Sequence, residues 1–254
     1  MMQKFYIRFR NATLAYPSSA YNALTLKEEL FKILRLKQRT RLLCDVVALK
    51  NITLDIHEGE RVGVIGRNGA GKSTLLKAIA GLYPLQSGTV ETAGKIRSLF
   101  ELNLGFEFEA TGRENVVYRG LLLGETPRSI REKEAEIVEF AELGEFIDYP
   151  IKMYSAGMLI RLAFAISTTI GGDILLLDEI LAAGDAAFQA KAQQRMDRLM
   201  EQAKMIVLVS HNLSAVQQIC DRAIYLHNGQ ILADGPVRDV VREYLDSVQA
   251  GATV

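Results

Sequence analysis

The sequence predicts an α/β fold with a mixed or parallel sheet and an inserted helical lobe, and three observations lead to this prediction. Short apolar segments typical of buried strands alternate with amphipathic segments typical of helices, as in a sheet covered on both faces. A glycine-rich loop, Gly66–Ser73, stands between one such strand and one such helix. From about residue 105 to 168 only helical patterns occur, so we expect this segment to form a separate lobe.

The individual elements follow from local patterns. Asn228-Gly229, between two short strand patterns, is a strong hairpin signal, and Thr111–Glu114 resembles a capping box at the start of a helix. Ser87-Gly88 and Ala93-Gly94 are turn signals between short strand-like pieces. In chain order we expect strands at 5–16, 47–56, 61–65, 174–178 and 205–209, a hairpin at 223–233, and helices at 74–80, 111–146, 154–169 and from Pro236 onward.

The loop Gly66–Ser73 has the G-x-x-x-x-G-K-S pattern that holds phosphate groups. Its glycines have no Cβ, so successive backbone N–H groups can point at a polyphosphate, and the start of the next helix adds a favourable dipole. Lys72 can reach the outer phosphates, and the Ser73 hydroxyl can bind Mg²⁺. A glycine turn that merely packs a helix on a sheet is the weaker alternative, because both flanks agree with the motif. The predicted nucleotide-binding residues are Gly66, Arg67, Asn68, Gly69, Ala70, Gly71, Lys72, Ser73 and Thr74.

Composition excludes several classes of protein. The 254 residues include 30 basic and 30 acidic side chains, and this zero net charge argues against general nucleic-acid affinity. Cys44 and Cys220 are far apart and match no metal-ligand spacing, so we expect free thiols in a reducing cytosol. No apolar run approaches the roughly 20 residues of a membrane span, and the first residues do not resemble a signal peptide. We therefore expect a cytoplasmic protein without an anchor of its own.

Polar residues follow two of the predicted buried strands. Asp178 and Glu179 end the run Ile174–Leu177, where ligands of α/β sheets collect. Asp178 has the position of a Mg²⁺-binding carboxylate, and Glu179 could orient or deprotonate an attacking water. His211 follows the strand 205–209 and could bond the γ-phosphate. An isolated Asp-Glu pair is usually a solvated strand end, and an isolated strand-end histidine is usually structural. The phosphate-binding loop upstream favours the functional reading.

The order of these motifs resembles the nucleotide-binding subunit of an ABC transporter over nearly the whole chain. The motifs are Gly66–Ser73, Tyr154–Met158, Ile174–Glu179, Ala183–Asp185 and Ser210-His211. The resemblance implies a P-loop NTPase core of the ABC ATPase type, with a mixed sheet, an antiparallel β-subdomain and an inserted α-helical subdomain. It also implies that ATP and Mg²⁺ are bound, that Lys72, Glu179 and His211 are catalytic, and that two copies close head-to-tail around two ATP molecules.

The resemblance assigns further roles, some with departures from the family pattern. Ser155, Ala156, Gly157 and Met158 match the signature motif that faces the nucleotide of the other copy, although Leu-Ser-Gly-Gly-Gln has become Tyr-Ser-Ala-Gly-Met. Asp185 matches the loop that links the two sites across the dimer. Glu101 stands near the position of a glutamine that contacts Mg²⁺ and the permease, and Tyr16 matches an aromatic residue that stacks on adenine. A tyrosine packed on its own core is an equally strong reading of Tyr16.

A basic segment, residues 18–45, separates the first two predicted strands. Its apolar residues Leu26, Leu30, Ile33 and Leu34 share one helical face, and residues 27–41 have six basic side chains against two acidic ones. A basic amphipathic helix is typical of a membrane surface or of contact with a membrane protein. The alternative is a helix packed on its own domain with a solvated charged face.

This insertion, the signature motif, Thr111–Asn115 and Leu177–Gln189 together resemble one branch of the family, the exporters of lipid-linked polysaccharides such as O antigen, capsule or teichoic acid. The branch implies a homodimer that serves a polytopic permease, present in two copies, at the inner face of the plasma membrane. We expect one ABC ATPase domain over residues 1–254, with a terminal helix and tail from 236. The end of the chain soon after this helix indicates no appended carbohydrate-binding domain.

Two other functions are compatible with a phosphate-binding loop. A soluble ABC ATPase acting on ribosomes or DNA is the main alternative, although such proteins usually have two cassettes or long coiled coils, and neither pattern occurs here. A P-loop kinase or GTPase is the other. The segment Tyr154–Met158, His211 and the lack of an Asn-Lys-x-Asp guanine motif all speak against it.

Overall fold

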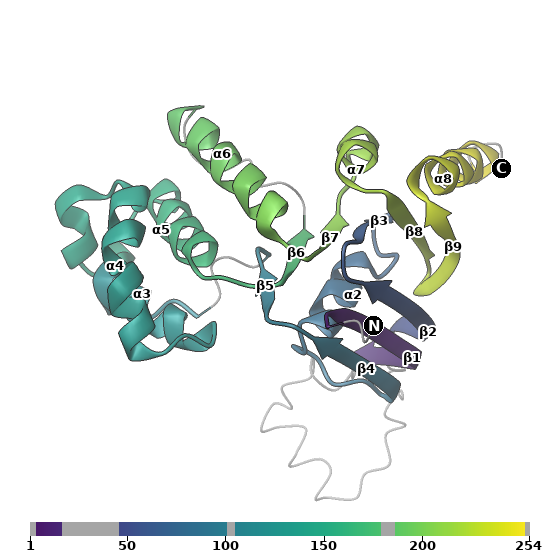
Figure 1. The fold of residues 1–254 in the computed structure, drawn as a ribbon, viewed down its shortest axis with the longest axis horizontal. Coiled ribbons are helices and arrows are strands. Elements are labelled where there is room, and N and C mark those ends of the chain that lie inside the picture. Colours follow the sequence, from purple (N-terminus) through teal and green to yellow (C-terminus); the bar gives the residue numbers. More distant parts are fainter. Residues whose placement is uncertain (1–3, 17–45, 101–104, 179–185, 252–254) are drawn as a thin grey trace, which may run out of the picture.

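The computed structural model describes residues 4–16, 46–100, 105–178 and 186–251. These form two β-sheets and a helical lobe (Figure 1). The chain order is β1 Tyr6–Tyr16, β2 Val46–His57, β3 Arg61–Ile65, α2 Lys72–Ile79, β4 Ser87–Ala93, β5 Ile96–Ser98, α3 Gly112–Leu122, α4 Pro127–Ala141, the 3₁₀ turns η2 Gly144–Asp148 and η3 Ile151–Met153, α5 Ala156–Thr169, β6 Ile174–Asp178, α6 Ala186–Gln202, β7 Met205–Val209, α7 Leu213–Ile219, β8 Arg222–His227, β9 Gln230–Pro236 and α8 Val237–Gly251. None of the described helices is long and apolar enough to cross a membrane.

The larger sheet has the strand order β5-β6-β7-β3-β8-β9 and is parallel except for the β8–β9 hairpin. Its central strands are apolar on both faces because each face is covered. Leu176 packs with α2 and the smaller sheet in one core cluster, whereas Leu175 and Leu177 pack in a second cluster with α5, α6, α7 and α8. This period of two along β6 explains the uninterrupted apolar run that predicted the strand.

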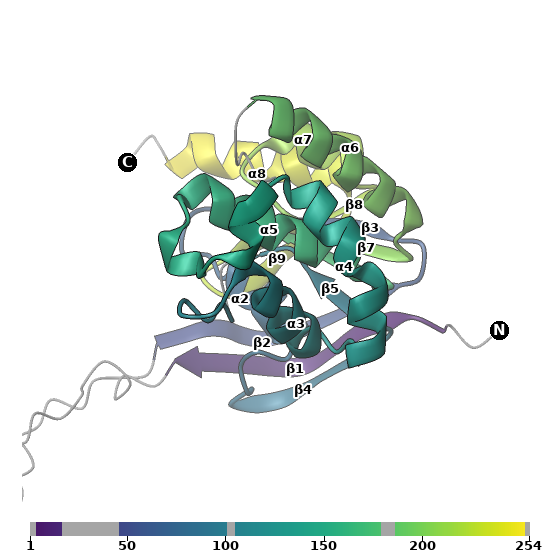
Figure 2. The same ribbon diagram turned by 90° about the vertical axis from the view of Figure 1, so that its left-hand side faces the viewer.

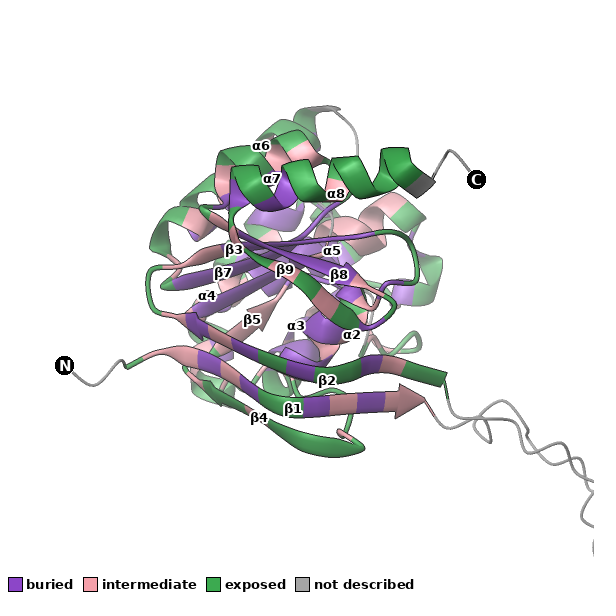
Figure 3. Ribbon diagram, turned by 90° about the vertical axis from the view of Figure 1, so that its right-hand side faces the viewer, coloured by how far each residue is buried: buried purple, intermediate pink, exposed green. Residues whose placement is uncertain are grey.

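The smaller sheet is antiparallel, with the order β2-β1-β4, and lies over α2 (Figures 1 and 2). Figure 3 shows buried and exposed residues alternating along β1 and β2, because one face packs on the core and the other faces solvent. Tyr16, the last residue of β1, pairs with Val46, the first residue of β2, so the residues that flank the segment 17–45 lie side by side. The structure of that segment lies outside the described residues.

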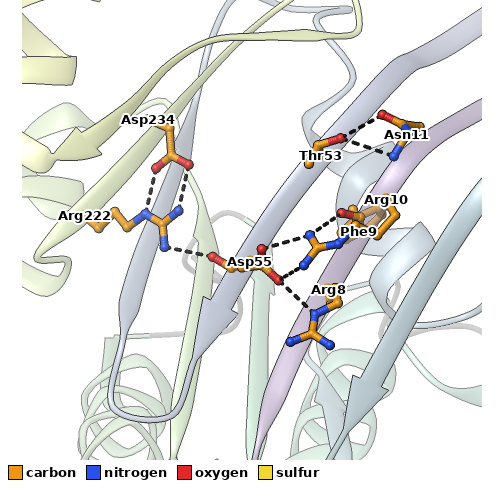
Figure 4. Close-up of polar contacts among 8 residues, drawn as sticks. All are labelled: Arg8, Phe9, Arg10, Asn11, Thr53, Asp55, Arg222 and Asp234. Carbon is orange, nitrogen blue, oxygen red and sulfur yellow. Dashed lines mark hydrogen bonds and ion pairs between the residues drawn. The ribbon is translucent and has the colours of Figure 1, made fainter.

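Arginine side chains tie the strands and the two sheets together (Figure 4). Asp55 on β2 accepts hydrogen bonds from Arg10 at 2.8 and 2.9 Å and from Arg8 at 3.0 Å, and the bond from Arg10 is the main cause of its lowered pKa. Arg222 on β8 forms a two-pronged pair with Asp234 and also donates to the Asp55 backbone oxygen at 2.9 Å. The guanidinium of Arg222 therefore connects the larger sheet directly to the smaller one.

The helical lobe contains α3, α4 and α5 and lies beside β5 and β6 (Figure 1). The predicted capping box is confirmed: the Thr111 side chain accepts from the Glu114 backbone N–H, and the Glu114 side chain accepts from the Thr111 N–H. Asn115 is fully buried, and its Oδ1 accepts from the Glu107 N–H at 2.8 Å. Its Nδ2 donates to the backbone oxygens of Glu107 and Thr111, both at 2.9 Å, so one amide fixes the loop before α3.

The structure corrects several details of the sequence prediction. Ser87-Gly88 is not a turn but the start of β4, where Gly88 has φ +78° and an added Cβ would lie 2.3 Å from the Asn11 oxygen. Gly88 sits at an irregularity in the β1–β4 pairing, and such a glycine gives the same local signal as a turn. The predicted 111–146 helical segment is broken into α3, α4 and η2, and α5 begins at Ala156 rather than at Tyr154.

Asn115 provides a test of the lobe's internal structure. Replacing it with alanine removes four hydrogen bonds to part-buried backbone groups, so we expect Asn115→Ala to lower the free energy of unfolding by about 2–4 kcal/mol. The control is Gln193→Ala on α6, an exposed amide that donates to Asp197 on the same helix, where we expect a change of less than about 0.5 kcal/mol. Urea unfolding followed by circular dichroism measures both. Equal stability of the two variants would show that Asn115 does not hold this loop.

Candidate nucleotide-binding site

The loop Gly66–Ser73 connects β3, in the middle of the larger sheet, to α2. Gly66, Gly69 and Gly71 have φ angles of +149°, +79° and +104°, which side-chain-bearing residues rarely adopt. Gly71 is the N-cap of α2 and makes no side-chain cap, so the first N–H groups of the helix are left for another acceptor. This arrangement suits a phosphate group at the helix N-terminus.

Lys72 is the first residue of α2 and is only 6% exposed. Its Nζ donates to the backbone oxygens of Gly66 at 2.8 Å and Arg67 at 3.1 Å, so the ammonium group lies across the loop. Ser73 and the residues Arg67, Asn68 and Gly69 are exposed, while Ala70 is buried. The predicted phosphate-binding residues are thus brought together, with one buried cation in their midst.

The turn between β8 and β9 is hydrogen-bonded to the loop Gly66–Ser73. The sequence did not predict this contact. The Gly229 N–H donates to the Ala70 oxygen at 2.9 Å, and the Gly229 oxygen accepts from the Lys50 N–H on β2 at 2.7 Å. An added Cβ would lie 2.6 Å from the Ala48 oxygen at Gly229, and 2.7 Å from the same oxygen at Gly71. Backbone atoms of the hairpin turn, the loop and β2 therefore approach one another closely.

The register of the parallel strands brings the predicted polar residues to the same edge as this loop. Asp178, the last residue of β6, pairs with Val209 of β7, and Val209 pairs with Val64 of β3. Asp178 is partly exposed. His211 follows β7 by two residues and is exposed, so it lies at the strand end that neighbours the loop.

The residues at this edge fit a magnesium nucleotide. Mg²⁺ usually takes one or two protein oxygens and fills its other positions with phosphates and water, and the Asp178 carboxylate and the exposed Ser73 hydroxyl offer such oxygens. Among the residues that the structure describes, no group of three or more histidine, cysteine or acidic side chains could hold a metal. An ion held by the oxygens of Asp178 and Ser73 would take its other ligands from phosphate groups and water.

Tyr16 lies at the end of β1, next to the helix that follows the loop. Its hydroxyl is 3.2 Å from Thr74 Oγ1, and its ring meets the Tyr83 ring edge-on at 5.3 Å between centroids. This position is beside the nucleotide-binding residues, but the ring also packs within the protein. Stacking of Tyr16 on adenine stays a prediction.

The signature residues lie in the helical lobe rather than beside the phosphate-binding loop (Figure 1). Ser155 caps α5, accepting from the Met158 N–H at 3.3 Å, and an added Cβ at Gly157 would meet only Ser155 Oγ, at 3.9 Å. A cavity of about 700 Å³ adjoins this turn. The preceding Tyr154 is buried and donates to the Phe146 oxygen at 2.5 Å, and burial raises its pKa to about 12. The start of α5 is thus anchored and open to a ligand from outside.

Three predicted site residues lie outside the described residues: Glu101, Glu179 and Asp185. Their roles stay predictions. Cys44 is also outside this part of the chain, whereas Cys220 is a free, buried thiol, and burial raises its pKa to about 12.

The glycine loop, the carboxylate and the inserted helical lobe define an α/β protein of the kind that binds nucleoside triphosphates. The chain belongs to the ABC transporter family, whose sequence profile, described as ABC transporter, matches residues 49–182, just over half of the chain. The family and the fold class predicted from the sequence are both confirmed.

Several similar proteins are named as parts of export systems. The chain is 40% identical over 242 residues to the O-antigen export system ATP-binding protein RfbB of Klebsiella pneumoniae, covering 94% of the chain and 96% of that protein. It is 44% identical to the protein of the same name from Myxococcus xanthus, covering 88% of the chain. It is 43% identical to the teichoic acids export ATP-binding protein TagH of Enterococcus faecalis, covering 78% of the chain. The chain spans about half the length of these last two relatives, 51% and 44%.

Solved structures support the same fold. The dimeric ATP-binding cassette MJ0796 with ADP and phosphate bound superimposes with a TM-score of 0.64 at 25% identity, covering 91% of this chain and 99% of the other. The ATP-binding subunit of an ABC transporter superimposes with a TM-score of 0.69, covering 98% of this chain, and at 20% identity it bears on the fold alone.

The contact between Gly229 and the loop can be tested by substitution. We expect Gly229→Ala to weaken nucleotide binding at least about tenfold, because a Cβ at φ +80° would press on the Ala48 oxygen and displace the support of Ala70. The matched control is Gly59→Ala, which has φ +91° but nothing within 4 Å of the added atom. Titration with a fluorescent ATP analogue measures both affinities. If the two variants bind alike, backbone strain rather than the loop contact is responsible.

Proposed function

We propose that this chain is the ATP-binding and ATP-hydrolysing subunit of an exporter that moves a lipid-linked polysaccharide, such as O antigen, across the cytoplasmic membrane. It works as a homodimer at the inner membrane face with a separate polytopic permease, present in two copies. The observation that carries the proposal is the loop Gly66–Ser73 beside Asp178, in a chain whose relatives are named as export ATP-binding proteins. These relatives favour transport over the ribosome- or DNA-acting alternative.

The described residues divide the work of nucleotide binding. The N–H groups of the loop and of the first turn of α2 hold the phosphates, and Lys72 turns from the loop oxygens toward their negative charge. Ser73 and Asp178 would hold Mg²⁺, and Glu101 is proposed as a third ligand. The bound ion would neutralise charge on the phosphate oxygens. Catalysis in this class depends on how charged groups are positioned around the phosphates. The register of β6, β7 and β3 is therefore important, because it fixes where Asp178 and His211 lie relative to the loop.

Hydrolysis needs residues from two copies of the chain. Glu179 orients the attacking water and His211 donates to the transferring phosphoryl group. Ser155 of the partner subunit and Gly157 of the partner subunit close on the γ-phosphate. The N-terminus of a helix with an open glycine suits this contact. The location of Ser155–Met158 in the helical lobe supports completion of the site by a second copy.

The role of Glu179 predicts a separation of binding from chemistry. We expect Glu179→Gln to bind ATP normally but to hydrolyse it roughly 10²–10⁴-fold more slowly, because a positioned base is lost. The same variant should accumulate ATP-bound dimers, detected by light scattering after gel filtration. Glu201→Gln, an exposed carboxylate at the end of α6, is the control. Normal turnover by Glu179→Gln would remove Glu179 from the mechanism, and failure to bind ATP or to dimerise would contradict the proposed function itself.

The basic insertion is proposed to contact the membrane surface or the permease. The two strands that flank it end side by side, where Tyr16 of β1 pairs with Val46 of β2. We expect replacement of Lys32, Arg35, Lys37, Arg39 and Arg41 by glutamine to spare the ATPase activity of the isolated subunit and to impair export in cells. Export assayed with the chromosomal gene replaced by the variant measures this effect. Unimpaired export would assign the segment to its own domain surface.

A further inference from the structure

A second cavity, of about 430 Å³, lies where the helical lobe joins the core. Figure 1 shows β5 at this junction, with α4 and α5 in the lobe and α6 above. None of the predicted nucleotide-site residues lines it. Its walls come from β5, α4, the end of α5 with the glycines that follow it, and α6: Arg97, Lys133, Glu136, Thr168, Thr169, Gly171, Arg195, Arg198, Leu199 and Gln202.

The lining is strongly cationic. Four basic side chains face one carboxylate, that of Glu136. Arg195 is occupied, since it pairs with Glu136 and donates to Thr169 Oγ1 at 2.9 Å. Lys133 forms a 3.0 Å ion pair with Glu125, which is not part of the lining, but its ammonium group has further N–H donors. The lining therefore has more positive charge than its own carboxylate can balance.

Among the described residues, the side chains of Arg97 and Arg198 have no hydrogen bond or ion pair, although the main chain of Arg97 pairs with β6. Arg97 is half-buried, and its Nε is fully buried without a hydrogen-bond partner. Burial, followed by repulsion from Arg195, lowers the pKa of Arg97 to about 10. A guanidinium held this way is unfavourable unless an anion accepts its hydrogen bonds.

The shape and chemistry of the lining define the class of anion. Guanidinium groups match the oxygens of phosphate with paired hydrogen bonds, and two of them are available here. The lining includes no aromatic ring on which a nucleotide base could stack, and its only large apolar side chain is Leu199.

We propose that this cavity binds a phosphate-class anion, such as inorganic phosphate or diphosphate, through Arg97 of β5 and Arg198 of α6, with Lys133 of α4 as a third contact. Lys133 belongs to the helical lobe, whereas Arg97 and Arg198 belong to the core. The bound anion therefore bridges the helical lobe and the core. It lies next to Gly171–Gly172, in the connection between α5 and β6. It acts as a regulatory ligand that favours one orientation of the lobe.

Calorimetric titration of the full chain with diphosphate tests the site. Because the loop Gly66–Ser73 also attracts phosphate, the titration is made in a Lys72→Ala background, which weakens that first site. In this background we expect diphosphate binding to persist and to weaken at least about tenfold in Arg97→Gln/Arg198→Gln, since two charged hydrogen-bond donors are lost. The matched control is Arg128→Gln/Arg131→Gln, two exposed arginines of α4 away from the cavity, which should change affinity less than about twofold.

Arg198→Gln alone is the second variant, because an exposed side chain can be replaced without unfolding the protein, and we expect roughly three- to tenfold weaker binding. Hydrogen exchange should slow on both α4 and α6 when diphosphate is added. Binding to vesicles with and without phosphatidic acid distinguishes the source of the phosphate. Binding to phosphatidic acid vesicles that depends on Arg198 identifies a lipid phosphate. Binding of diphosphate by a protein that does not bind these vesicles identifies a free anion. Loss of all binding in Lys72→Ala, or equal affinity of the cavity and control variants, would overturn the proposal.

Discussion

The close approach of backbone atoms at the phosphate-binding loop is the constraint on which the site depends. Gly66 would place a Cβ 2.2 Å from the Leu226 oxygen of β8, and Gly71 and Gly229 would each crowd the Ala48 oxygen of β2. A side chain at any of these positions would separate the two sheets or distort the loop. The same glycines that leave N–H groups for a phosphate thus also allow β2, β3 and the β8–β9 turn to meet.

Local signals in the sequence predicted most of the fold correctly. The apolar run before Asp178, the Asn228-Gly229 turn and the Thr111 capping box each depend on a few adjacent residues, so they could be recognised without a structure. The contact between Gly229 and Ala70 joins residues far apart in the chain, and no periodicity encodes it. Gly88 was misread as a turn because a left-handed glycine at a strand irregularity and one in a turn give the same signal.

The altered signature motif retains the features that a phosphate contact needs. Ser155 supplies the hydroxyl and caps α5, and Gly157 has free space around its Cα. The two departures, Ala156 and Met158, contribute differently: Ala156 is an exposed first-turn residue, and Met158 packs partly against the core of the lobe while its N–H bonds Ser155. Neither substitution removes a charged or backbone donor from the turn, so the motif can serve its proposed role despite the change in sequence.

The cationic cavity and the nucleotide site are connected through a short, rigid path. Gly172 leads directly into β6, whose five residues end at Asp178, and β6 pairs with β5 on one side and β7 on the other. Five strand residues span about 16 Å, with no loop between the two ends. A bound anion can shift the lobe only if its affinity differs between lobe orientations. Such a difference is expected here, because Lys133 and Glu136 move with the lobe while Arg97 and Arg198 stay with the sheet and α6. Movement of the Lys133 ammonium and the Glu136 carboxylate relative to this fixed arginine pair is therefore what could convert anion binding into a bias on the nucleotide site.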